Sequence, residues 1–168
     1  FGRFWHLDQK NEYCDKEHDS CNQGIGKDHG IGGLLLENEA LDKVADILSP
    51  NDFYRHDHKA IFQHIAKLIE HNRPADIVTV AESLESTAEL YGVGGIAYLG
   101  ALAQSTPTAA NIRRYAEIVH ERAVMRQLVV VGSGIAESAY LPNGRNAEQL
   151  LDEAEAKIFQ IAEGGKKS

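Results

Sequence analysis

The sequence predicts an all-α protein, in which a small helical bundle is followed by an antiparallel helical hairpin. Apolar residues from Ile31 onward recur three and four positions apart, which is the spacing of one face of an α-helix. Proline and glycine interrupt these runs at the places where helices would end. The β-branched segment Asp76–Val80 has no neighbouring run with which a strand could pair, so we expect helix or loop there.

The size and composition of the chain are those of a folded domain. It has 168 residues, 43% hydrophobic and 25% charged, which suffices for a core without a disulfide or a metal. Its 17 Lys and Arg against 25 Asp and Glu give a net charge of −8, which argues against a surface dedicated to coating DNA. The longest apolar run, Leu128–Val131, is far shorter than the roughly 20 residues that span a bilayer, so we expect no membrane association. Two cysteines without an export signal predict a cytoplasmic protein.

The first part of the chain divides into a tail and a helical head. Residues 1–30 mix aromatic, charged and glycine residues without a sustained period, so we interpret them as a tail or an appended segment. Residues 31–107 are expected to form the head. The apolar positions that predict its helices are Leu34, Leu41, Val44, Ala45 and Leu48 before Pro50; Ile61, Ile65, Leu68 and Ile69 before Asn72; Val80, Ala81 and Leu84 after a Thr79 N-cap; and Ile96, Leu99, Leu102 and Ala103 after three glycines.

The hairpin is expected over residues 108–163. Its first arm runs from Ala109 to about Tyr140, a Pro-Asn-Gly turn follows, and Asn146 with Gln149 resembles the capping box that opens a second arm. The two predicted seams, which we also take as the candidate oligomer interface, are Val124, Leu128, Val131 and Ile135 on the first arm and Leu151, Ala154, Ile158 and Ile161 on the second. Such a hairpin has little interior of its own, so we expect self-association; packing of the hairpin against the head is the alternative.

Two glycine-rich segments resemble nucleotide-binding loops, and neither fits. Gly132 and Gly134 lack the third glycine or alanine of a dinucleotide fingerprint, because position 137 is Glu, and no βαβ unit surrounds them. Gly24–Lys27 lacks the first glycine of a phosphate loop, and Asp28 stands where Ser or Thr would hold magnesium. We therefore expect no catalytic residues, no cofactor in this chain and no ATP hydrolysis by it.

Two groups of potential metal ligands also have simpler interpretations. Cys14, His18, Cys21 and His29 do not have the spacing of a zinc finger, so we interpret them as residues of a loose tail. His56, His58, His64 and His71 lack a carboxylate three or four positions away that would complete a ligand set, so we expect solvated histidines on an exposed helix face, with Asp57 as the N-cap. A small metal-dependent enzyme remains the weakest hypothesis.

Several blocks together resemble the N-terminal domain of the bacterial replicative DNA helicase of the DnaB family. They follow one another in order from Ile31 to about Glu163. The blocks are IGGLLLENEAL at 31–41, ILSPNDFYR at 47–55, DIVTV at 76–80, VGGIAYL at 93–99, TAANI at 108–112, YAEIV at 115–119 and LLDEAEAKI at 150–158. Two departures are the Lys27–Gly30 segment, where the family has an acidic helical approach, and the glycines at 132 and 134 within a hairpin helix.

The resemblance implies an assembly and docking role. In the family, hairpins pair into dimers, three dimers form a collar on a hexameric ring, and the collar engages primase and helicase loaders. Residues 164–168 would begin the linker to a motor domain that uses ATP and magnesium and acts on DNA. We therefore expect a non-catalytic domain that supports ring formation and partner recruitment; a free-standing helical adaptor without a motor is the alternative.

Overall fold

The computed structural model describes residues 26–106 and 109–164, and every regular element in these two ranges is helical. The elements, in order, are α2 (Gly26–Leu36), the 3-10 helices η1 (Asn38–Leu41) and η2 (Pro50–Asp52), α3 (His56–Glu70), α4 (Ile77–Ser86), α5 (Gly95–Ser105), α6 (Ile112–Tyr140) and α7 (Ala147–Gly164). The predicted all-α class is confirmed.

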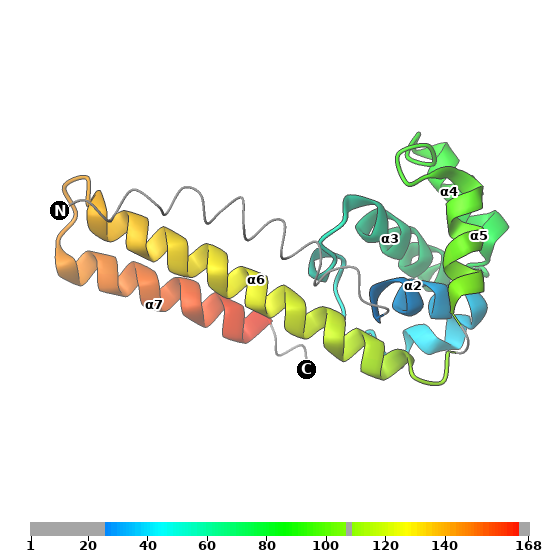
Figure 1. Cartoon of the computed structure of the whole chain (residues 1–168), viewed down its shortest axis with the longest axis horizontal. Helices are drawn as coiled ribbons and strands as arrows, with labels where there is room; N and C mark the ends of the chain where they lie inside the picture. Colours follow the sequence, from blue (N-terminus) through cyan, green and yellow to red (C-terminus); the bar gives the residue numbers. More distant parts are fainter. Residues whose placement is uncertain (1–25, 107–108, 165–168) are drawn as a thin grey trace.

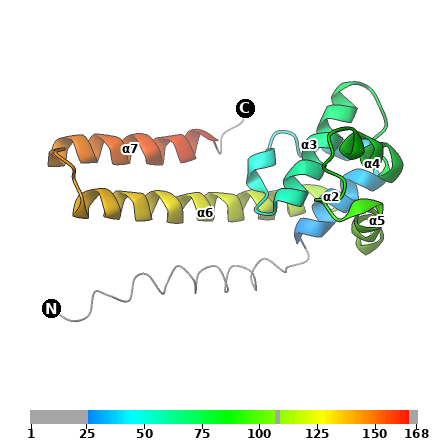
Figure 2. The same ribbon diagram turned by 90° about the horizontal axis from the view of Figure 1, so that it is seen from above.

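The molecule has a compact head from which a long hairpin projects (Figures 1 and 2). Helices α2 to α5 and the first turns of α6 form the head, whereas the rest of α6 and the antiparallel α7 form the hairpin. Helix α6 therefore belongs to both parts. None of the helices in the described ranges is long and apolar enough to cross a membrane.

The hydrophobic core lies in the head. It contains most of the predicted apolar positions of the head helices and, from α6, Ile112, Ala116 and Val119. Two predicted positions, Ala45 and Ile96, are exposed instead. The fully buried side chains include Ile31 and Leu34 on α2, Ile61 and Ile65 on α3, and Leu99 on α5. Because these side chains leave water completely, each stabilises the head by roughly 1.5–3 kcal/mol relative to an exposed position.

The first predicted helix differs from the structure, because α2 ends at Leu36 and the segment 38–48 forms a 3-10 helix and turns. Asn38 supplies the physical reason. Its side-chain amide donates to the Leu34 carbonyl at 3.0 Å and to the Ala75 carbonyl at 3.1 Å, and its Oδ1 accepts from the Ala75 N–H at 2.8 Å. The side chain thus takes over a helical carbonyl and attaches this corner to the loop before α4.

Two predicted helix starts are also corrected by one turn or less. The N-cap of α4 is Asp76, whose Oδ1 accepts from the N–H groups of Val78 and Thr79 at 2.9 Å, while Thr79 is the third residue of the helix and completes the capping box. In α3 the N-cap position is Arg55, and Asp57 lies in the first turn, where it pairs with Arg55. A carboxylate there still favours the helix N-terminus.

The segment Asp76–Val80 enters α4, as the lack of a partner strand predicted. Helix α6 runs without interruption through Gly132 and Gly134. Nothing lies within 4 Å of a Cβ placed at either glycine, so these residues do not mark a close approach of another described element.

Candidate functional site: the hairpin surface

The hairpin tip is a tight, locally encoded turn. Asn143 and Gly144 both have positive φ angles, 50° and 84°, a conformation that asparagine and glycine tolerate best. The predicted capping box is confirmed: the Gln149 N–H donates to Asn146 Oδ1 at 2.9 Å, and the Asn146 N–H donates to Gln149 Oε1 at 3.0 Å. Arg145 adds an ion pair with Glu153 at 2.6 Å. These local bonds direct α7 back along α6.

The two arms pack loosely along their length. A hollow of about 500 Å³ near the head is lined by Val131 and Ile161, among others, and a second of about 300 Å³ near the tip is lined by Ile135, Leu151 and Ala154. Among the described hairpin residues beyond the core of the head, Ala123 and Ile161 are the buried apolar ones. With two open hollows along the arms and so few buried apolar side chains, the hairpin alone lacks a close-packed core.

The structure brings together some of the eight predicted seam residues and leaves others in solvent. Val124, Val131, Ile135 and Ala154 are half-buried, and Ile161 is buried. In contrast, Leu128, Ile158 and Leu151 are 45%, 50% and 70% exposed. The facing seams are therefore incomplete within one chain, and three of their large apolar residues remain available.

Further exposed apolar side chains on the hairpin were not predicted. They include Met125, Val129 and Val130 on α6 and Phe159 on α7, and at the tip Tyr140 and Leu141. Periodicity missed them because they lie outside the three-and-four stripe. The unbroken apolar run Leu128–Val131 was the available signal, since four consecutive apolar residues must point to all sides of a helix.

A polar cluster attaches the hairpin to the head at the root of the hairpin. Arg126 of α6 donates to the Asp52 carbonyl at 2.6 Å, and its guanidinium lies 5.6 Å from the centre of the Tyr54 ring. His120, also on α6, lies 3.3 Å from the Asp52 carboxylate. Burial lowers the pKa of Arg126, although the nearby Asp52 charge opposes this. Two successive turns of α6 thus hold one loop of the head.

The predicted solvated histidines are wrong at two of four positions. His56 and His71 are exposed, but His58 and His64 are only 2% and 7% exposed. His58 Nε2 lies 2.8 Å from the Tyr98 hydroxyl, and His64 lies 2.7 Å from Ser83 Oγ and 3.0 Å from Glu89 Oε2. Burial of a histidine requires such partners. These side chains support the head from within.

No metal-ligand cluster occurs in the part of the chain that the structure describes, where no three His, Cys, Asp or Glu side chains converge. Cys14, His18 and Cys21 lie outside that part, as does Gly24 of the loop-like segment. Lys27, Asp28 and His29 lie in the first turns of α2.

Comparison with known proteins decides the family. The profile described as the DnaB-like helicase N terminal domain matches residues 30–121, which comprise the head and the first third of α6. The chain belongs to this family. The resemblance read from the sequence blocks is therefore confirmed.

Relatives extend the similarity of this DnaB-like domain into the hairpin. The replicative DNA helicase DnaB of Haemophilus influenzae is 41% identical over 133 residues, and the replicative DNA helicase DnaC of Bacillus subtilis is 40% identical over the same length. Each alignment covers 79% of this chain but only 28% and 29% of the relative. The chain thus spans less than a third of the length of these proteins.

Solved structures show the same architecture. The N-terminal domain of DnaB helicase from Mycobacterium tuberculosis superposes with a TM-score of 0.77 at 36% identity, covering 82% of this chain and 97% of that one. A DnaB-like replicative helicase studied with primase superposes with a TM-score of 0.66 at 20% identity, which supports the fold alone. Helicase N-terminal domains of this kind are non-catalytic parts of their proteins.

Proposed function

We propose that this DnaB-like domain is the assembly and partner-docking part of a hexameric replicative helicase in the cytoplasm. Its hairpin would pair with the hairpin of a second copy, and three such pairs would form the collar of a ring. The observation that carries the proposal is the apolar surface of the hairpin, which comprises the exposed residues Met125, Leu128, Val129, Val130, Leu151, Ile158 and Phe159.

The incomplete packing of the hairpin supports association. Exposed apolar residues grouped on one projecting element are uncommon on a monomer and are typical of interaction surfaces. Burying one Leu, Ile or Phe contributes roughly 1.5–3 kcal/mol, so a surface with seven such positions has enough apolar area to offset the cost of association. Two hairpins packed side by side would also fill the hollows between the arms.

The partners of the whole protein belong to the same proposal. A relative with this fold is described together with primase, so the collar built from this domain is the place where we expect primase and a helicase loader to dock. ATP, magnesium and DNA would be handled by a motor domain elsewhere in the protein. The domain itself would contribute geometry: it holds subunits in register and presents the outer surface of the collar.

The test of assembly replaces exposed hairpin residues by a charge. Leu128→Asp and Ile158→Asp are expected to lower the solution mass measured by light scattering, because an unpaired carboxylate in the contact costs several kcal/mol. Ile96→Asp is the matched control, since Ile96 lies on the head and is 51% exposed, against 50% for Ile158. Wild-type mass in both hairpin variants would contradict the proposal.

The alternative is a free-standing helical adaptor that lacks a motor. The same domain could then associate without ever forming a helicase ring. The length of the gene beyond the codon for Ser168 separates the two, because the helicase reading requires an ATPase domain to follow.

A further inference from the structure

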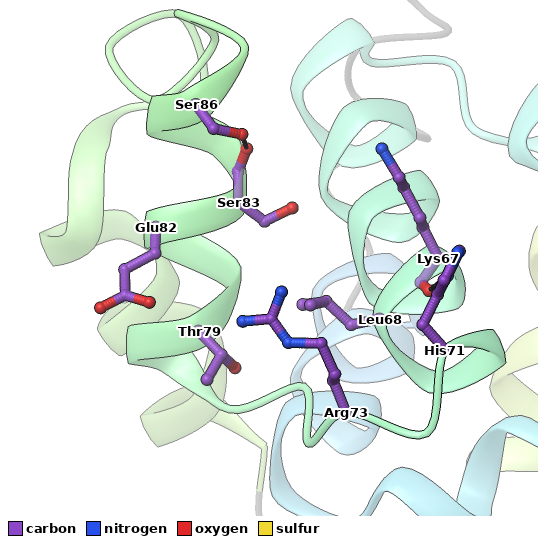
Figure 3. Close-up of a pocket in the computed structure, with 8 residues that line it drawn as sticks. All are labelled: Lys67, Leu68, His71, Arg73, Thr79, Glu82, Ser83 and Ser86. Atoms are coloured by element: carbon purple, nitrogen blue, oxygen red, sulfur yellow. Dashed lines mark hydrogen bonds between the residues drawn. The ribbon is translucent and has the colours of Figure 1, made fainter.

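A second hollow lies on the head, away from the hairpin. It has a volume of about 400 Å³ and is formed by the end of α3, the loop 71–76 and the exposed side of α4. Seven of its eight lining residues are polar or charged, and the residues drawn in Figure 3 are Lys67, Leu68, His71, Arg73, Thr79, Glu82, Ser83 and Ser86. The volume lies in the range of pockets that hold small ligands, about 300–1,000 Å³.

Two cations of this hollow have no partner in the described part of the protein. Most described Lys and Arg side chains lie beside a carboxylate or a carbonyl: Lys43, Arg55, Arg113, Arg114, Arg126 and Arg145. Lys67 and Arg73 make no such contact within residues 26–106 and 109–164. In a chain with a net charge of −8, two unneutralised cations in one concavity are a specific feature.

Arg73 is held rigidly at the mouth of the hollow. Asn72 has a φ of 54°, the Arg73 N–H donates to the Leu68 carbonyl at 2.9 Å, and the Asn72 N–H donates to the Ile69 carbonyl at 2.9 Å. These bonds form a Schellman motif, which closes the end of α3. Two residues later, Ala75 is fixed by Asn38. The backbone of Arg73 is therefore anchored on both sides before any ligand arrives.

The cations reach the gap from different elements. In Figure 3 the guanidinium of Arg73 lies between α3 and α4, and Lys67 rises from α3 opposite Ser83 and Ser86. Glu82 projects from α4 away from Arg73. The hydroxyls are engaged with the protein, since Ser86 donates to the Ser83 carbonyl at 2.6 Å and Ser83 lies 2.7 Å from His64. Lys67 and Arg73 are thus the donors that the protein leaves for a ligand.

We propose that this hollow is a binding site for the diphosphate group of a small ligand, either inorganic pyrophosphate or a nucleoside diphosphate. The guanidinium fork of Arg73 would bind one phosphate in a bidentate manner, and the ammonium of Lys67 would bind the other. A diphosphate fits better than one carboxylate, because its oxygens extend over two phosphorus atoms and meet cations from two elements.

His71 offers a contact of another kind. Its Nδ1 lies 2.7 Å from the Lys67 carbonyl, which can only accept, so Nδ1 carries the hydrogen. In the neutral ring Nε2 then accepts a hydrogen bond, which suits a sugar hydroxyl beside the phosphates. A nucleoside diphosphate would use this acceptor and pyrophosphate would not. Comparing the affinities of the two ligands therefore measures what the His71 contact adds to binding.

The experiment is calorimetric titration of the 168-residue chain at low salt with pyrophosphate, ADP and adenosine. Pyrophosphate and ADP are expected to bind with dissociation constants below about 1 mM, and adenosine is not expected to bind. Lys67→Gln and Arg73→Gln should each weaken the binding of both phosphate ligands about tenfold or more, because each variant removes a charge-assisted contact. Unchanged thermal melting shows that these variants fold.

Lys59→Gln is the matched control. Lys59 also lies on α3 and has no partner in the described ranges, but it does not line the hollow. If Lys59→Gln lost as much affinity for pyrophosphate and ADP as Lys67→Gln, the proposed site would be wrong. That result would show only a general attraction of these anions to the positive charges of the protein. Citrate binding as tightly as pyrophosphate would overturn the phosphate preference. Competition by a single-stranded oligonucleotide without a terminal phosphate would identify a DNA contact instead.

Discussion

Gly32 of α2 lies directly against Thr106 at the end of α5, and no side chain fits between them. A Cβ placed on Gly32 would overlap the Thr106 hydroxyl oxygen and the Leu102 carbonyl oxygen. That carbonyl already accepts the Thr106 hydroxyl at 3.0 Å, so neither atom can move away without losing a buried bond. The Gly-Gly pair at 32–33 thus permits the close approach of α2 to its neighbours.

Replacing Gly32 by Ala is therefore expected to destabilise the head. Overpacking a close contact typically costs about 1–3 kcal/mol, which exceeds the gain in helix propensity. Gly132→Ala is the control in a helix with open space, and it should stabilise the chain by about 1 kcal/mol. Urea unfolding of both variants measures the difference. Equal effects of the two substitutions would show that the α2–α5 approach does not require glycine.

The link between Arg126 and Asp52 gives a second prediction. Arg126→Gln removes the bond to the Asp52 carbonyl and the contact with Tyr54, and it should destabilise the chain by about 1–3 kcal/mol. Arg122→Gln lies one turn away on the exposed side of α6 and should change stability by less than about 0.5 kcal/mol. Proteolysis near residues 50–55 should also accelerate in Arg126→Gln. If the two variants unfold alike, the hairpin root is not held by this cluster.

Glu89 makes the stability of the head sensitive to acid. Hydrogen bonds from the Thr87 hydroxyl and from His64 lower the pKa of Glu89 below its ordinary value of 4.5. A group whose pKa is lower in the folded state contributes stability above its unfolded pKa and loses it as the pH falls through the folded value. The contribution of Glu89 is therefore complete above pH 4.5 and declines below it.

Glu89→Gln tests this dependence. The variant should melt at a lower temperature than the wild type near pH 6, and the difference should shrink as the pH falls below 4.5 and Glu89 becomes protonated. The pKa of Asp76 is also lowered, chiefly by the hydrogen bond from the Thr79 N–H. Asp76 is unchanged in the variant, so its contribution to the pH dependence is the same in both proteins. A constant difference across this range would assign the effect to packing and not to charge.

Local patterns were sufficient to predict much of the fold. The helical period located α3 and α5, and the Asn146–Gln149 cap, whose partners are three residues apart, was read directly from the sequence. The errors involve distant partners. Asn38 bonds to Ala75, 37 residues away, and His58 meets Tyr98, 40 residues away. The spacing of apolar residues along the chain contains no information on such distant contacts. The early end of α2 and the burial of His58 could therefore not be predicted.

The candidate site was predictable in part for the same reason. The three-and-four stripe identified Ile161 and Ala154, which line the hollows together with residues of α6, but it placed Leu128 and Ile158 in a closed seam although both are half in solvent. A stripe defines one face of each helix, whereas the rotation of two helices about their axes depends on their contacts with everything else. The role of these residues in association stays a prediction.

The last prediction concerns single-stranded DNA, which this chain should bind weakly. Four arginines of α6, Arg113, Arg114, Arg122 and Arg126, are the cations that the sequence offers along one helix. Arg113 pairs with Asp46 at 3.2 Å, Arg114 with Glu117 at 3.2 Å, and Arg126 is bound to the head. Arg122 has no ion pair in the described part of the chain, so few phosphates can be neutralised along α6 without breaking a bond already made.

Fluorescence anisotropy with a labelled oligonucleotide at several salt concentrations measures this. Because each phosphate contact contributes about 0.7 to the slope of log K against log salt for single strands, we expect a slope no steeper than about −2 and no detectable binding at physiological salt. Asp46→Asn frees Arg113 and should strengthen low-salt binding, whereas Arg122→Gln should weaken it. Tight binding that is nearly independent of salt would require a contact surface other than these arginines and would refute the prediction.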